Sequence, residues 1–148
     1  MDLENYTINL KPRAKRSNRT VFIDEECALV LQKWLKVRKQ YNPKCNALFV
    51  NTRGNRINRN DVYYTIVKWA TYVGLHNPDS DNPEDHFTPH NFRHWFTTWL
   101  LRNGMPREYV KELRGDARKE AIDIYHRIDP EDLKREYLRC IPKLGIII

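Results

Sequence analysis

The stretch Thr88-Pro89-His90-Asn91-Phe92-Arg93 combines a helix start signal with two side chains, His90 and Arg93, that can act on an anion. Thr88 can cap a helix whose first residue is Pro89, because the first helical turn leaves its N–H groups unsatisfied and proline has none to lose. His90 and Arg93 are three positions apart, so their side chains project from one face of that helix. An imidazole beside a guanidinium can bind a phosphate and move a proton at it. The stretch therefore predicts a phosphate-binding helix.

Two later segments extend the pattern, Leu113-Arg114-Gly115-Asp116-Ala117 and Ile124-Tyr125. Attack on a phosphodiester without metal needs a nucleophile, donors for the non-bridging oxygens and an acid for the departing oxygen. A tyrosine phenol has an ordinary pKa of about 10, so it becomes a useful nucleophile only beside positive charge and a proton acceptor. Clustered Arg, Lys and His supply that setting. The alternative for Tyr125 is a core or surface tyrosine, one of eight in the chain.

Composition places the chain in a broad class. Its 148 residues and 41% hydrophobic content fit one globular domain. The net charge of +7 favours polyanionic partners, although a basic balance can also serve solubility alone. The three cysteines are far apart and predict neither a disulfide framework nor a zinc knuckle. No apolar run approaches the roughly 20 residues of a membrane span, so we expect a soluble, cytoplasmic protein without a membrane partner.

The order of secondary-structure signals predicts a mostly helical domain with a small antiparallel sheet at its front. β-favouring runs at 6–10 and 20–23 flank a basic hairpin tip at 11–19. Capping residues and helical spacing predict helices at about 25–39, 59–73, 89–104, 106–115, 117–124 and 130–139. The segment 76–86, rich in Asn, Asp and Pro, is expected to form an ordered loop.

Apolar residues at helical spacing predict the buried faces of three of these helices. They are Ala28, Leu31, Leu35 and Trp34 in the first; Val62, Ile66, Trp69, Ala70 and Val73 in the second; and Trp95, Phe96, Trp99 and Leu100 in the third.

The order and spacing of the motifs resemble those of the tyrosine recombinase (phage integrase) family. Its signature is a His-x-x-Arg helix, a later Gly-His or Gly-Asp turn, and a nucleophilic tyrosine nine residues beyond that turn; Asp116 to Tyr125 is this interval. The resemblance implies an α+β, mainly α fold, the DNA breaking-rejoining catalytic domain, with residues 1–148 forming a single partial domain truncated at its N-terminus. The sequence motifs around 103–106 and 114–116 are most similar to those of archaeal integrase-type recombinases.

The resemblance also assigns roles. Tyr125 would attack the phosphate and form a 3′-phosphotyrosine link, while Arg93 and His90 stabilise the transition state. Lys15, on the basic hairpin, would protonate the departing 5′ oxygen, with Lys11 as the alternative acid. Asp116 cannot donate to a phosphate at neutral pH, so we expect it to orient neighbouring groups or cap the next helix.

DNA-binding residues are expected around this centre: Lys11, Arg13, Arg16, Arg19, Arg114 and His126. The alternatives are a basic turn that touches phosphates without specificity, solvated helix faces and an exposed loop histidine. His94 follows His90 by one turn, but Asn91 stands where a zinc helix carries glutamate, so we expect neither a metal nor a cofactor.

One expected arginine is not in the sequence. The family carries it in a Gly-Leu-Arg motif just before the strand that begins here at Tyr6. Removing one such donor commonly costs on the order of 10²–10³ in rate, so we expect the chain alone to be weakly active. A fragment, a split-gene product and an inactive remnant all fit this pattern.

The expected function is site-specific recombination or integration of double-stranded DNA by strand cleavage and rejoining. The partners would be DNA, further copies of the chain on DNA, or an N-terminal integrase half. A type IB topoisomerase-like activity shares the chemistry. The alternative from another class is a catalytically silent DNA-binding or partner-binding remnant of an integrase.

Overall fold

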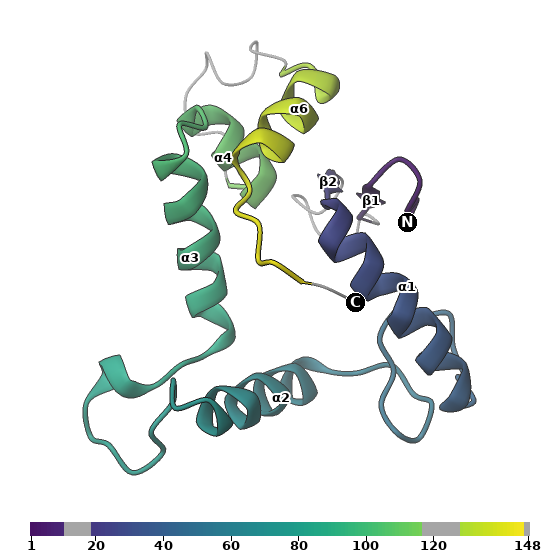
Figure 1. Cartoon of the computed structure of the whole chain (residues 1–148). Helices are drawn as coiled ribbons and strands as arrows, with labels where there is room; N and C mark the ends of the chain where they lie inside the picture. Colours follow the sequence, from purple (N-terminus) through teal and green to yellow (C-terminus); the bar gives the residue numbers. More distant parts are fainter. Residues whose placement is uncertain (11–18, 117–127, 147–148) are drawn as a thin grey trace. The chain divides into compact units, whose positions relative to one another are not determined.

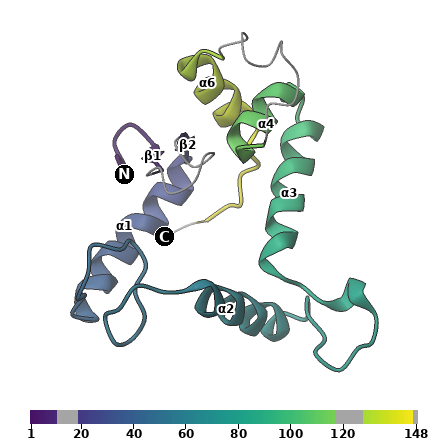
Figure 2. The same cartoon turned by 180° about the vertical axis from the view of Figure 1, so that it is seen from behind.

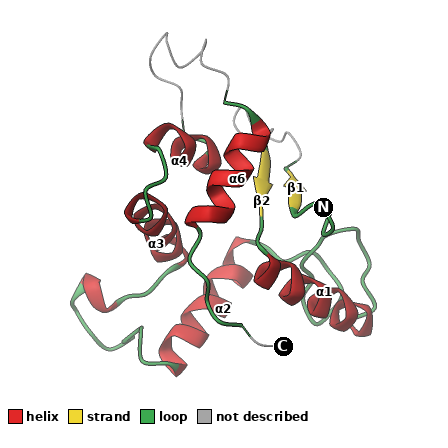
Figure 3. Ribbon diagram, turned by 45° about the horizontal axis from the view of Figure 1, so that its top comes forward, coloured by secondary structure: helices red, strands yellow, loops and turns green. Residues whose placement is uncertain are grey.

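The computed structural model describes residues 1–10, 19–116 and 128–146, which fall into two compact units. One unit joins Met1–Leu31 to Phe96–Ile148, and the other is Gln32–Trp95. Figure 1 shows the elements in chain order, from β1 in purple to α6 in yellow-green. Helices dominate the described elements, and the two strands form a small sheet (Figure 3). The mainly helical fold with a small antiparallel sheet is thereby confirmed.

The sheet consists of β1 (Thr7–Asn9) and β2 (Thr20–Phe22), which pair antiparallel with Thr7 opposite Phe22. Both strands are shorter than the runs 6–10 and 20–23 that the sequence predicts. Tyr6 has a φ of 54°, which turns the chain before β1 begins. Hydrogen bonding continues past the strand ends, because the Leu10 N–H donates to the Arg19 carbonyl at 2.9 Å. The hairpin strands are confirmed, and the basic tip at 11–18 lies outside the described residues.

Helix α1 (Glu25–Gln40) begins after a carboxylate cap. Asp24 Oδ1 accepts the N–H of Cys27 at 2.9 Å, which satisfies one of the donors that a helix start leaves free. Ala28 and Leu31 are buried, as the helical spacing predicted. Trp34 and Leu35, one turn on, are only partly buried.

A complete capping box starts α2 (Arg59–Tyr72). The Asn58 side chain accepts the N–H groups of Asn60 and Asp61, and the Asp61 carboxylate accepts the N–H of Asn58 at 2.8 Å. The predicted helix is confirmed, but its apolar stripe is largely uncovered. Only Ala70 is buried, whereas Trp69 is 58% exposed. The prediction that this stripe is the buried face of the helix is therefore largely wrong, because helical spacing gives no information on whether other elements cover the stripe.

The loop between α2 and α3 is ordered, as expected. It contains a 3₁₀ turn, η1 (Pro83–Asp85), and the Ser80 hydroxyl donates to the Asp85 carboxylate at 2.6 Å. His76 is buried, with its Nδ1 3.2 Å from the Phe87 carbonyl. These contacts hold the segment that leads into α3.

Helix α3 (Pro89–Arg102) starts with a cap that differs from the predicted one. The Asn91 side-chain oxygen accepts both the Thr88 N–H, at 2.8 Å, and the Thr88 hydroxyl, at 3.0 Å. Asn91 therefore holds the helix start together with Thr88. The prediction of the buried face of α3 is partly wrong. Leu100 is fully buried, but Trp99 is 37% exposed, because the side of the helix that faces the core carries Phe96 and Leu100.

Two further helices belong to the unit that contains the sheet. Helix α4 (Arg107–Arg114) ends at Gly115, whose φ of 66° is the left-handed conformation typical of a helix stop. Helix α6 (Pro130–Cys140) begins at Asp129, which accepts the N–H groups of two first-turn residues. The helix predicted at 117–124 lies outside the described residues.

The core of this unit brings β2, α3, α4 and α6 together. Figures 1 and 2, taken from opposite sides, both show α4 and α6 side by side. The Asn103 amide donates to the Cys140 carbonyl at 2.6 Å and joins the end of α3 to the end of α6. The buried cluster consists of Phe22, Leu100, Met105, Val110, Leu113, Leu133, Tyr137 and Cys140. Over the part of the chain that is described, none of the helices has the length and apolarity to cross a membrane.

Candidate functional site

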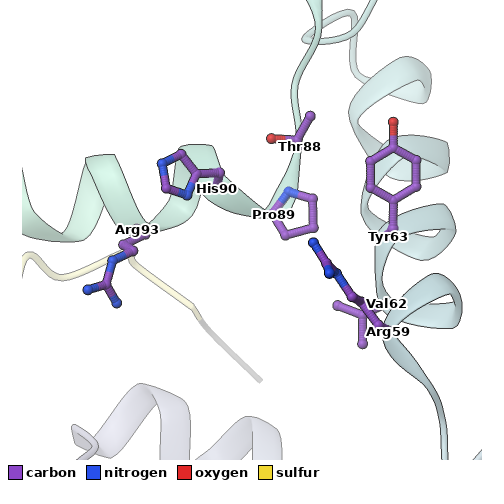
Figure 4. A pocket seen from close by; sticks show the side chains of 7 residues that line it. All are labelled: Arg59, Val62, Tyr63, Thr88, Pro89, His90 and Arg93. Carbon is purple, nitrogen blue, oxygen red and sulfur yellow. The ribbon is translucent and has the colours of Figure 1, made fainter. Parts of the chain in front are cut away.

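A pocket of about 580 Å³ opens in the unit Gln32–Trp95, between the start of α2 and the start of α3. This volume lies within the range typical of ligand pockets. Figure 4 shows the contributions of the two helices: Arg59, Val62 and Tyr63 come from α2, and His90 and Arg93 come from α3. Thr88 and Pro89 complete the lining. The two residues that the His-x-x-Arg motif singled out therefore share one pocket.

The electrostatics of this pocket favour an anion. Its lining carries two arginines and one histidine, and none of its residues is an aspartate or glutamate. Both helices meet the pocket at their N-terminal turns, where the positive end of the helix dipole lies. At the start of α2, the Asn58 side chain already accepts the N–H groups of Asn60 and Asp61, so the Arg59 side chain is the donor that this helix offers to an anion. A phosphate in the pocket would meet fixed positive charge from both helices.

His90 and Arg93 are both exposed, so water and ligands reach them directly. The His90 ring stands edge-on to the ring of His94, with 4.5 Å between the centroids. Within the residues that the structure describes, no group of three or more His, Cys, Asp or Glu side chains is arranged to hold a metal ion. The pocket itself contains His90 but not His94.

Arg59 and Tyr63 are pocket residues that the sequence did not single out. Arg59 is the first residue of α2, directly after the Asn58 cap, and Tyr63 lies one turn later. Their spacing of four places them on one helical face, which was the available signal. Nothing in the sequence indicated that this face meets the start of α3, because the long loop 73–88 separates the two helices.

The Gly-Asp turn lies in the other unit, at the end of α4. Asp116 Oδ2 is 3.1 Å from Arg114 Nε, and both side chains are about 30% exposed. Arg19, predicted to bind DNA, donates to the carbonyls of Leu113 and Arg114. Arg19, Arg114 and Asp116 therefore form one polar cluster around the turn, which we call the turn cluster.

The remaining predicted site residues lie outside the described residues. They are the proposed nucleophile Tyr125, the proposed acid Lys15 with its alternative Lys11, and the predicted DNA contacts Arg13, Arg16 and His126.

Comparison with known proteins identifies the class. The model of the phage integrase family matches residues 1–132, so the chain belongs to the phage integrase family. This family is the one whose motif order the sequence resembles, and the resemblance is thereby confirmed.

Named relatives and a solved structure agree with this assignment. The chain is 31% identical over 143 residues to tyrosine recombinase XerC of Actinobacillus pleuropneumoniae serotype 7 (strain AP76), covering 97% of this chain and 44% of that protein. It is 32% identical over 143 residues to XerC of Haemophilus ducreyi (strain 35000HP), with the same shares. The crystal structure of XerA recombinase matches with a TM-score of 0.70 and 26% identity, over 97% of this chain and 49% of that one. The chain thus spans less than half the length of these relatives.

Proposed function

We propose that this chain is the part of a tyrosine-type site-specific DNA recombinase that binds and cleaves the DNA strand. The observation that carries the proposal is the pocket that Arg59, His90 and Arg93 share at two helix N-termini. Membership of the phage integrase family supports it, and so do relatives named tyrosine recombinases. The substrate would be double-stranded DNA, bound through its phosphates by the basic surface of the chain.

In the proposed reaction, the scissile phosphate lies in the pocket. The guanidinium of Arg93 binds its non-bridging oxygens, because a planar and permanently charged fork can bind two oxygens at once. His90 donates a second hydrogen bond or relays a proton. Arg59 adds a further positive charge from the facing helix. These donors stabilise the charge that develops on the oxygens as phosphorus is attacked.

Tyr125 is the proposed nucleophile. Its oxygen attacks phosphorus, the bond from phosphorus to the 5′ oxygen breaks, and a 3′-phosphotyrosine link forms. Lys15, or Lys11 in its place, gives a proton to the departing oxygen. Attack by a 5′ hydroxyl on the phosphotyrosine then rejoins the strands and releases the tyrosine. The link conserves the energy of the phosphodiester bond, so the cycle needs no nucleotide cofactor.

Recombination also needs two DNA sites in one assembly. We propose that copies of the chain associate on DNA, or that the chain acts with a polypeptide that supplies the family's additional arginine. Rejoining to a second DNA end gives recombination or integration, whereas rejoining after rotation of the free end gives topoisomerase activity.

Covalent capture tests this proposal. A DNA duplex nicked just downstream of the scissile phosphate loses a short fragment after attack, so the phosphotyrosine cannot be reversed and accumulates. We expect wild-type protein, alone or with the arginine-supplying polypeptide, to become attached to this DNA, and Tyr125→Phe to give no attachment. Tyr109→Phe, on α4, is the matched control and should behave as wild type.

The same assay addresses the rival function. A catalytically silent DNA-binding remnant would bind the duplex with salt-dependent affinity and would never become attached under either condition. Attachment that persists in Tyr125→Phe would show that another residue is the nucleophile and would refute the assigned role.

A further inference from the structure

Arg19 joins the base of the hairpin to the end of α4. It directly precedes β2, and its guanidinium donates from Nε to the Leu113 carbonyl at 3.2 Å and from Nη2 to the Arg114 carbonyl at 3.4 Å. These partners lie 94 and 95 positions later in the chain, within the same unit. Arg19 therefore connects the basic hairpin to the Gly-Asp turn at the end of α4.

The chemistry of a helix end explains this contact. The last carbonyls of a helix have no partner within it and carry partial negative charge, so a cation with several donors stabilises them. The fork of Arg19 reaches two successive carbonyls, which one ammonium group could not do in the same geometry. The backbone of Arg19 is also fixed, because its carbonyl accepts the N–H of Leu10 at 2.9 Å. The Arg19 side chain thus extends from a backbone position that is held by this hydrogen bond to Leu10.

Gly115 shows how closely the guanidinium approaches the turn. A Cβ at this position would lie 2.6 Å from Arg19 Cζ, so the guanidinium would have to move to admit a side chain here. The φ of 66° requires glycine independently. The Gly115 N–H donates to the Glu112 carbonyl and the Asp116 N–H to the Lys111 carbonyl, each at 3.0 Å. Arg19 therefore packs over a turn whose backbone N–H groups are already hydrogen-bonded.

We propose that Arg19 is a positioning residue that holds the turn cluster in place, and that it is not a DNA phosphate contact. Its hydrogen bonds to the Leu113 and Arg114 carbonyls hold the end of α4, directly before the turn in which Asp116 lies beside Arg114. This inference rests on the proposed function, because it assigns the turn cluster a part in strand cleavage. It replaces the DNA-binding role that the basic hairpin predicted for Arg19.

Two variants separate positioning from phosphate binding. Arg19→Lys keeps the positive charge and loses the fork, whereas Arg19→Gln loses both. We expect both to slow single-turnover cleavage by about tenfold to a hundredfold, because a small misplacement of a catalytic cluster has costs of this size. We expect the dissociation constant for DNA and its salt dependence to stay within about twofold of wild type in both. A lost phosphate contact would instead lower the salt slope by about one.

The predicted hairpin contact Arg13 supplies the matched control. Arg13→Gln should weaken DNA binding and lower the salt slope, and Arg13→Lys should restore both. If Arg19→Lys cleaves at the wild-type rate while Arg19→Gln shows the binding defect of Arg13→Gln, Arg19 is a phosphate contact and the inference is overturned.

Amide hydrogen exchange gives a readout that does not depend on cleavage. We expect the amides of Gly115 and Asp116 to exchange at least several-fold faster in Arg19→Lys, and the amides of Leu133 and Tyr137 in the core to exchange as in wild type. Unchanged exchange at the turn would refute the inference even if the protein cleaves DNA. If exchange is faster in Arg19→Lys but the wild-type protein never cleaves DNA, the proposed function is refuted. The hydrogen bonds from Arg19 to the end of α4 would then be purely structural, and the catalytic part of the inference would be overturned.

Discussion

Lys143 Nζ lies 3.2 Å from Asp24 Oδ2, so a residue beyond the last helix is joined to the cap of the first. The other oxygen of the same carboxylate accepts the Cys27 N–H at 2.9 Å. Two residues on, the Glu26 carboxylate accepts the N–H groups of Leu144 and Gly145 at 2.8 and 3.0 Å. The start of α1 thereby binds the C-terminal segment through two carboxylates.

The two contacts of Asp24 should differ in their contribution to stability. Asp24 caps α1 and is only 6% exposed. Asp24→Ala removes this cap, and we expect it to lower the free energy of unfolding by about 1–2 kcal/mol. Lys143→Gln removes an ion pair whose lysine side chain is 58% exposed, and should cost no more than about 0.5 kcal/mol. Urea unfolding of the two variants measures both values. A larger loss in Lys143→Gln than in Asp24→Ala would contradict this assignment.

Neighbouring leucines on α3 provide a test of the core. Leu100 has no exposed surface, and Leu100→Ala should lower the free energy of unfolding by about 2–5 kcal/mol, because it leaves a cavity in the cluster. Leu101 is 37% exposed, and Leu101→Ala should cost clearly less. Equal losses, measured by urea unfolding, would show that the helix buries a different face from the one described.

Tyr137 should make stability fall at alkaline pH. Burial, followed by the nearby Asp24 and Cys27, raises the pKa of this phenol well above its ordinary value of about 10. The unfolded chain therefore loses this proton first, and stability that is complete below about pH 10 declines as the pH rises further. Tyr137→Phe should flatten this decline between pH 9 and 11, measured by urea unfolding. The 79% exposed Tyr72 is the control, since Tyr72→Phe should leave the slope unchanged.

Arg59 is predicted to contact DNA because it lines the pocket with His90 and Arg93. Arg59→Gln should weaken DNA binding by severalfold and lower the salt slope by about one, as expected for one lost phosphate contact. Arg56→Gln is the matched control, because Arg56 lies in the same unit but outside the pocket lining. Fluorescence anisotropy at several salt concentrations measures both variants, and equal effects would place Arg59 outside the phosphate site.

Local chemistry made much of the fold predictable. The helices expected at about 59–73 and 130–139 form at Arg59–Tyr72 and Pro130–Cys140, because cap preferences such as those of Asn58 and Asp129 act over a few residues. Gly115 stops α4 for an equally local reason, its left-handed φ. The hairpin strands were also predictable, although Tyr6 turns the chain earlier than the β-favouring run indicated.

Long-range contacts were not predictable in the same way. Helical spacing put Trp99 on an apolar face, but burial depends on which neighbours cover that face, and the buried line runs through Leu100. That Arg59 and Arg93 line the same pocket depends on the course of the loop between α2 and α3. The role of Arg19 was likewise hidden, because a basic hairpin near a proposed DNA site gives no sign that one of its arginines bonds to a helix end.

The proposed function requires that Arg93 binds a charged oxygen of the scissile phosphate. Its most direct test replaces that phosphate by a methylphosphonate, which lacks the negative charge. Single-turnover cleavage by Arg93→Ala is compared with wild type on both substrates, and Arg107→Ala, from an exposed position on α4, is the control. We expect Arg93→Ala to lose about a hundredfold or more on the phosphate and to recover most of that loss on the methylphosphonate. A deficit of the same size on both substrates, or none on either, would contradict the claim.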